Sequence, residues 1–152
     1  MIIQYFVGEQ GKYAESLRVA KDACGKRGIG YKLISKRPCY LGEPDDPRKD
    51  STVVRLVELI ADPFATFLDA DTLIDDRIFD LSYVPGKPYI GSGVCGAYAI
   101  YGNGCREIFK KILDVYDKSK WCICCQYLIS HKDEFNVFPS GVIKHLKLWG
   151  KR

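Results

Sequence analysis

The sequence predicts a three-layer α/β domain in which a mixed β-sheet is flanked by helices. In the first half, short β-prone runs alternate with segments whose apolar residues recur at helical spacing. That order favours parallel strands joined by crossover helices. The second half holds further strand-like segments, and the simplest assembly adds them as antiparallel strands. A chain of 152 residues is the size of one domain, so we expect a single compact domain over residues 1–152.

The first half is expected to run strand, helix, strand, loop, helix, strand. A helix is expected to follow from Tyr13 and to end at Gly25 and Gly28, and a second helix is expected to be capped by Asp50 or Ser51. The three expected strands are β-prone apolar runs, at residues 2–7, 31–34 and 64–68. The segment between the second strand and the second helix holds three prolines and many charges, so it is expected to be a loop.

The second half is expected to contribute four more strands and two more helices. The strand-like segments are residues 89–90, 97–101, 136–138 and 142–143. The expected helices cover residues 105–116 and about 122–129. Cysteines cluster in the second of these helices, at Cys122, Cys124 and Cys125, but a zinc site needs a second separated ligand pair. We therefore interpret them as small apolar side chains.

Composition excludes several classes of protein. Hydrophobic residues make up 47% and charged residues 28% of the chain, as in folded soluble proteins. No apolar run reaches the roughly 18 residues of a membrane span, and the N-terminus does not look like a secretory signal, so we expect a cytoplasmic protein with reduced thiols. The net charge of +4 gives no strong nucleic-acid signal but suits an anionic ligand bound at one site.

The most informative segment is Asp69-Ala70-Asp71, which comes directly after a strongly apolar strand. Ligands of open α/β sheets collect at the carboxyl ends of the strands. Residues i and i+2 of an extended chain share one side, so the two carboxylates can converge. Close carboxylates repel unless a proton or a cation lies between them, and Mg²⁺ or Mn²⁺ is the natural occupant. The alternative is that both aspartates are ordinary turn residues.

The sequence around this pair resembles the core of nucleotide-sugar glycosyltransferases of the GT-A fold. The similarity is strongest to the retaining galactosyltransferase and glycogenin-like family, where an Arg-Leu pair on a helix precedes a strand that ends in Leu-Asp-x-Asp-Thr. Here these elements are Arg55-Leu56 and residues 68–72. Weaker similarities lie at three later segments, Gly91–Val94, Cys125-Gln126 and Ile143–Lys151. Two departures are Gly91, which stands where the family has Asn, and Cys125, which stands where the family has Asp.

The resemblance implies a metal-dependent transfer of a sugar from a nucleotide-sugar, a UDP-sugar in the first instance, to a hydroxyl acceptor with retention of configuration. It implies that Asp69, Asp71 and His145 bind Mn²⁺ or Mg²⁺, with Asp69 also at the ribose. Arg55 and Gly93 would lie at the donor, and Lys151 at the phosphates together with Lys147 and Arg152. Position after the first strand places Val7, Gly8 and Tyr13 at the base.

Gln126 is the residue expected beside the anomeric carbon, where a neutral amide would orient or stabilise the reacting centre rather than attack it. If the enzyme instead inverts configuration, Asp133 or Glu134 could serve as the base. Two alternative functions remain open: a non-catalytic module that binds a nucleotide-sugar, and a metal-dependent nucleotidyltransferase. A nicotinamide or flavin site at Gly91–Gly96 is disfavoured, because a strand rather than a helix is expected to follow these glycines.

Overall fold

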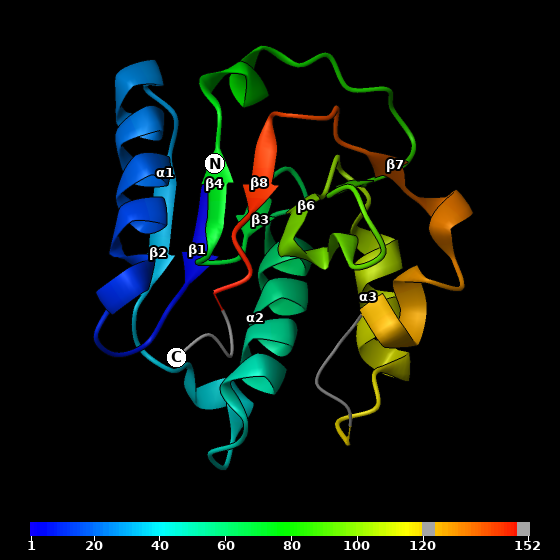
Figure 1. Ribbon diagram of the computed structural model, residues 1–152. Helices are drawn as coiled ribbons and strands as arrows, with labels where there is room; N and C mark the ends of the chain where they lie inside the picture. The colour runs from blue at the N-terminus through cyan, green and yellow to red at the C-terminus, as the bar shows by residue number, and fades with distance from the viewer. Residues whose placement is uncertain (120–123, 149–152) are drawn as a thin grey trace.

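A computed structural model of the chain describes residues 1–119 and 124–148 (Figure 1). Its centre is a mixed sheet with the strand order β2-β1-β3-β6-β5-β7. The bounds of these six strands are β1 Ile2–Tyr5, β2 Tyr31–Ile34, β3 Thr66–Leu68, β5 Tyr89–Ile90, β6 Ala99–Tyr101 and β7 Asn136–Val137. β1 is parallel to both β2 and β3, and β6 is antiparallel to β3 and β5. The predicted fold class, parallel first and then mixed, is confirmed.

Alternate residues of the strands face two separate cores. Ile3 and Phe67 point into a core shared with the helices α2 (Pro47–Ala61) and α3 (Arg106–Val115). Ile2 and Leu68 point into a second core, which they share with the helix α1 (Ala14–Arg27). One residue of register shift would exchange these faces, so the period of two along β1 and β3 specifies the three layers.

A two-stranded sheet adds to the layer that holds α1. β4 (Thr72–Ile74) follows directly after β3 and pairs antiparallel with β8 (Ile143–His145), as Figure 1 shows near the centre of the molecule. The sequence interpretation did not contain β4, because its three residues carry too short a pattern to be distinguished from a turn. Its register sets Thr72 opposite His145 and so brings the end of the described chain to the end of β3.

Helix α2 corrects two expectations. It begins at Pro47 with Asp46 as N-cap, not at Asp50 or Ser51, because proline fits the first helical position and a helix start needs no N–H there. The helical spacing of its apolar residues predicts a buried stripe at positions 53, 56, 57 and 60, but the buried positions are Asp50, Thr52, Val54, Arg55, Leu56 and Leu59. The helix packs on the sheet and on α3 at once, so its buried surface is wider than one stripe.

Two segments of the second half differ in type from the expected elements. Residues 97–101 divide into a 3-10 turn, Gly96–Tyr98, and the strand β6. The glycine motif Gly91–Gly96 therefore leads into a strand and not into an α-helix, which agrees with the prediction. The helix expected at 122–129 is a π-helical turn, Cys124–Leu128, and residues 120–123 lie outside the described part of the chain. Within the described residues, no helix has the length and apolar character needed to cross a membrane.

We predict that Asp46 stabilises α2 in a pH-dependent way. Its carboxylate accepts hydrogen bonds from the backbone N–H (2.9 Å) and guanidinium of Arg48, and these bonds, opposed by burial, lower the pKa of Asp46. Replacing it with Ala should cost about 1 kcal/mol near pH 7. A lowered folded pKa means that this stabilisation is complete above the unfolded pKa of about 3.9 and disappears as the pH falls through the folded value.

Urea unfolding of wild type and Asp46→Ala between pH 7 and pH 2 measures this effect, and the two unfolding free energies should converge in acid. Asp46→Asn is the matched control, because Asn caps well but does not ionise; it should lose less than half as much as Ala at pH 7. A constant difference between wild type and Asp46→Ala across the range would contradict the assignment.

A second stability prediction compares two glycines. A Cβ at Gly102 would lie 2.2 Å from the carbonyl oxygen of Pro63, which is backbone and cannot move aside cheaply. At Gly25, inside α1, a Cβ would meet no heavy atom within 4 Å. We expect Gly102→Ala to destabilise the fold by about 1–3 kcal/mol and Gly25→Ala to stabilise it by about 0.5–1 kcal/mol. Denaturant unfolding of the two variants should give shifts of opposite sign, and equal shifts would show that the turn at Gly102 adapts.

Candidate functional site

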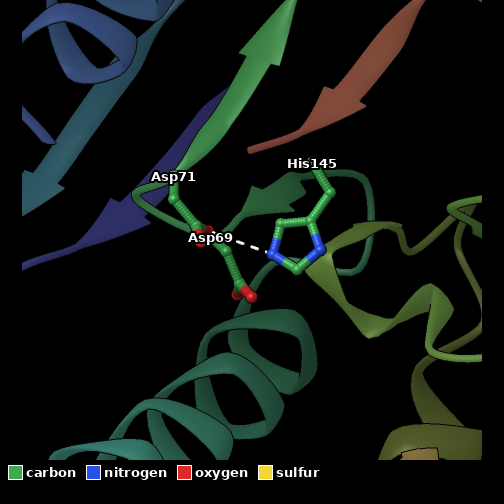
Figure 2. Close-up of side chains that lie close together, drawn as sticks. All are labelled: Asp69, Asp71 and His145. Carbon is green, nitrogen blue, oxygen red and sulfur yellow. Dashed lines mark ion pairs between the residues drawn. The ribbon is translucent and has the colours of Figure 1, made fainter. Parts of the chain in front are cut away.

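Asp69, Asp71 and His145 come together at the carboxyl end of β3. One ligand atom of each residue lies within 4.8 Å of the other two. Figure 2 shows the Asp71 carboxylate and the His145 ring facing one another. The Asp69 carboxylate points toward the helix drawn below it, which has the colour of α2 in Figure 1. His145 Nε2 is 3.2 Å from Asp71 Oδ1. These are the three residues that the sequence predicted as metal ligands.

Backbone hydrogen bonds fix the turn that presents the two carboxylates. The turn closes with a bond from the Thr72 N–H to the Asp69 carbonyl (3.0 Å). The carbonyl of Tyr98 accepts from the Asp69 N–H (2.8 Å) and from the Thr72 hydroxyl (3.2 Å). The turn that carries both carboxylates is therefore hydrogen-bonded at its first residue, Asp69, and at its last residue, Thr72, to the carbonyl of Tyr98.

Asp71 is buried and fully engaged. Oδ1 faces His145, and Oδ2 accepts a 3.0 Å bond from the backbone N–H of Leu148. The Asp71 carbonyl also accepts from the Leu146 N–H (2.9 Å). Burial raises the pKa of Asp71, but the hydrogen bond and charge of His145 and the Leu148 N–H outweigh it, so the pKa lies below its ordinary value. The site thus favours an ionised carboxylate in a largely dry position.

Asp69 is the more accessible carboxylate, and its partner is Arg55. The Arg55 guanidinium, from the middle of α2, forms an ion pair with Asp69 Oδ1 and lies 5.5 Å from the centre of the Phe67 ring. The Arg55 side chain is 6% exposed and that of Asp69 is 26% exposed. Within the described residues Arg55 Nε has no hydrogen-bond partner although it is buried. Such unpaired buried groups are uncommon and gather at functional sites.

The residues predicted at the base lie on the loop after β1. Val7 and Gly8 are exposed, and Gly8 has a φ of +102°, a conformation that favours glycine. The Tyr13 ring packs against Phe6 with 4.7 Å between ring centres. Burial, then the negative charges of Asp71 and Asp69, raise the pKa of Tyr13. Tyr13 therefore lies in the electrostatic field of the two carboxylates, while no contact of Val7 or Gly8 with the three ligands is seen among the described residues.

The other predicted residues have partners other than the three ligands, or lie outside the described residues. Gly93 is exposed with a φ of +97°, and its carbonyl accepts from the Lys132 side chain (3.3 Å). The Gln126 amide is paired with both backbone groups of Asp117, at 2.7 and 3.0 Å. Lys151, predicted at the phosphates, lies outside the described residues, as does Arg152.

The two carboxylates considered as a base differ in their surroundings. Asp133 is exposed, whereas Glu134 accepts a 2.7 Å bond from the Tyr127 hydroxyl and lies 3.9 Å from the Lys111 ammonium. Glu134 is thus part of a local structural network. Neither residue belongs to the Asp-Asp-His group.

Sequence reasoning missed several residues that support the site. Gln4 is fully buried on β1, donates to the Asp69 carbonyl at 3.3 Å and accepts from the Tyr31 hydroxyl at 2.8 Å. The Ser16 hydroxyl donates to the Ala70 carbonyl. A glutamine inside the apolar run Ile2–Tyr5 was the one available signal, since a buried polar side chain must find partners. Tyr98 and the Leu148 N–H carried no signal, because tertiary contacts alone select them.

The donor set fits a divalent metal ion. Two carboxylates and one imidazole are ligand types of Mn²⁺ and related ions, and Mg²⁺ uses carboxylates in the same way. The lowered pKa of Asp71 favours its carboxylate form, which is the form that binds a metal ion. Asp69, Asp71 and His145 are the residues that would hold the ion.

No protein-family model matches this sequence, and no curated protein matches it. Solved structures do match. A glycosyltransferase involved in the glycosylation of the major capsid of PBCV-1 has a TM-score of 0.63 and 13% sequence identity, over 90% of this chain and 79% of that one. The β1,4-galactosyltransferase 7 of Drosophila, in a complex with manganese, UDP-Gal and xylobiose, has a TM-score of 0.55 and 12% identity, over 95% and 70%. At these identities the likeness establishes the fold, and it is GT-A-like.

The Arg55–Asp69 pair makes an asymmetric prediction about stability. Removing Asp69 leaves a buried guanidinium without its counter-charge, whereas removing Arg55 leaves a carboxylate that water can reach. We expect Asp69→Asn to cost about 3 kcal/mol and Arg55→Met, which keeps an apolar stem over Phe67, to cost about 1–2 kcal/mol.

Urea unfolding of both variants and of the double variant Arg55→Met/Asp69→Asn measures the coupling. The double variant should be more stable than Asp69→Asn alone, because the unpaired charge is gone. Equal costs of the two single changes that simply add in the double variant would show that the pair is not coupled.

Proposed function

We propose that this chain is a metal-dependent glycosyltransferase, which moves a sugar from a nucleotide-sugar to a hydroxyl acceptor. The observation that carries the proposal is the convergence of Asp69, Asp71 and His145 at the carboxyl edge of a GT-A-like sheet. The two similar solved structures are both glycosyltransferases, and one holds manganese with UDP-Gal. We take a UDP-sugar as the donor and Mn²⁺ or Mg²⁺ as the cofactor for the same reasons.

The chemistry that the metal ion supplies when bound is neutralisation of the charge that grows on the departing nucleoside diphosphate. The residues of the chain divide the remaining work. Asp71, buried and held by His145 and the Leu148 N–H, is the fixed ligand. Asp69 is more exposed and is paired with Arg55 of α2, and it would contact the ribose as well. Arg55 brings a permanent positive charge toward the donor.

Further residues complete the proposed donor site. Val7, Gly8 and Tyr13 at the carboxyl end of β1 would hold the base, and Gly93 would let the chain pass close to the sugar. Lys151 is proposed at the phosphates because it is a cation that follows His145 and the exposed Lys147 closely in the sequence.

Gln126 remains the residue that we propose beside the anomeric carbon, in a retaining reaction. For that role its amide would have to leave the Asp117 backbone, which the two hydrogen bonds of this structure oppose. The same observation supports the alternative of a non-catalytic module that binds a nucleotide-sugar. Assays of the chain with donor therefore have to separate binding from transfer.

Thermal unfolding with a panel of nucleoside diphosphates and their sugars, each with and without Mn²⁺, tests the proposal. One diphosphate class should raise Tm only when Mn²⁺ is present, because the ion is proposed to hold the diphosphate. The shift should be easy to detect, since a ligand at a hundredfold excess over Kd stabilises the native state by about 2.7 kcal/mol. The ligand-induced shift should vanish in Asp71→Asn and persist in Asp76→Asn, whose carboxylate lies in the 3-10 turn Asp76–Asp80 outside the ligand group. A shift that is independent of Mn²⁺, or retained in Asp71→Asn, would refute the assigned site.

Product analysis then distinguishes the three functions. Transfer or slow hydrolysis that releases a nucleoside diphosphate supports the glycosyltransferase. Metal-dependent binding without any turnover supports the binding module. Release of pyrophosphate supports a nucleotidyltransferase.

A further inference from the structure

Tyr98 connects more parts of the site than any of the residues discussed above, yet it is not itself a candidate ligand. It ends the 3-10 turn Gly96–Tyr98, directly before β6, and is 7% exposed. Its ring, its hydroxyl and its carbonyl each make a separate contact. Each contact leads to a different component of the proposed donor site.

The ring of Tyr98 stacks on the imidazole of His145. The ring centres are 4.6 Å apart and the planes differ by 10°. Metal-binding histidines usually donate their second ring nitrogen to a hydrogen-bond partner, which fixes the orientation of the ring. Among residues 1–119 and 124–148, the His145 ring forms an ion pair through Nε2 with Asp71 and stacks on Tyr98. The stacking contact therefore holds the plane of the ring, while the ion pair with Asp71 holds Nε2.

The carbonyl and hydroxyl of Tyr98 extend the same support. The carbonyl holds the carboxylate turn through the Asp69 N–H and the Thr72 hydroxyl. The hydroxyl donates to the Ser92 carbonyl at 3.0 Å. A Cβ at Gly91 would lie 2.2 Å from the Tyr98 ring, so the backbone of the loop before β6 packs directly against that ring. One side chain thus spans from the glycine loop to the third metal ligand.

We propose that Tyr98 is a positioning residue of the metal site, which sets metal affinity by holding the His145 imidazole in its ligating orientation. This inference rests on the proposed function, because it assumes that Asp69, Asp71 and His145 bind the ion. The terminal torsion of a histidine is broad, so a ring without support spends part of its time with Nε2 turned away. Apparent affinity falls by the fraction of time that the ligating orientation is populated.

The test measures Mn²⁺ dissociation constants by electron paramagnetic resonance of free Mn²⁺, on the full chain without nucleotide. Tyr98→Leu, which removes the stacking ring, should weaken Mn²⁺ binding by about tenfold or more, as loss of such supporting contacts typically does. Tyr98→Phe keeps the ring and loses its tether to Ser92, so it should weaken binding by about two- to fivefold. The ligand-field absorption of bound Co²⁺ should change in Tyr98→Leu, which a purely structural role of Tyr98 would not cause.

Tyr83 supplies the matched controls. It is a partly buried tyrosine in an aromatic cluster with Tyr89, Tyr101 and Phe138, and its hydroxyl donates to the Ile78 carbonyl at 3.4 Å. Tyr83→Leu and Tyr83→Phe should lower stability without changing Mn²⁺ affinity or the Co²⁺ spectrum. If Tyr98→Leu does not fold, the Tyr98→Phe and Tyr83→Phe pair decides, and an unchanged Mn²⁺ affinity in Tyr98→Phe overturns the proposal.

Asp71→Asn separates this inference from the function on which it rests. If Asp71→Asn binds Mn²⁺ as wild type does, the metal site itself is wrong. If Asp71→Asn loses Mn²⁺ binding while Tyr98→Leu and Tyr83→Leu bind it equally well, only the role of Tyr98 is wrong.

Discussion

The constraint on which the site depends is electrostatic: two carboxylates are brought close together at the edge of a sheet, one of them almost out of water. Like charges in such a place repel, and burial penalises each of them further. The fold compensates from several directions, with the buried guanidinium of Arg55 at Asp69 and with His145 and a backbone N–H at Asp71. Each compensating group comes from a different element, so the site can form only when the whole tertiary structure has formed.

The two carboxylates are compensated differently, and this difference gives them different capacities. Asp69 is paired with a permanently charged guanidinium and is a quarter exposed, so it can exchange contacts with a ligand while its charge stays balanced. Asp71 is held by an imidazole, which is itself a metal ligand when neutral. A divalent ion would take over the balancing of Asp71 from His145 without loss of either ligand. The pattern of one cationic and one ligating partner is what distinguishes this group from two ordinary turn aspartates.

The sequence was informative where a local pattern has a local cause. The β-prone runs at β1 and β2 and the helical spacing in α1 depend on neighbours in the chain, and these elements were predicted. Asp69 and Asp71 were identifiable because an acidic pair directly after a buried strand is itself an unusual local pattern. The start of α2 was misplaced because several residues were able to cap it, and Pro47 decides between them through its fixed φ.

The sequence could not show the contacts that residues distant in the chain make with the site. β4 became a strand only because β8, some seventy residues later, pairs with it, and that pairing is also what delivers His145 to Asp71. Nearness in the sequence would pair Arg55 with Glu58 of the same helix, but Glu58 pairs with Lys32. Arg55 turns toward Asp69 because α2 is buried on both the sheet side and the α3 side. Arg55 lies on the buried side of α2 with Val54 and Leu56, and its guanidinium pairs with the Asp69 carboxylate at the end of β3. The Arg55–Asp69 ion pair therefore serves two purposes: it satisfies a buried charge in α2 and it balances the charge of the site. This explains why a charged residue lies in the middle of a core helix.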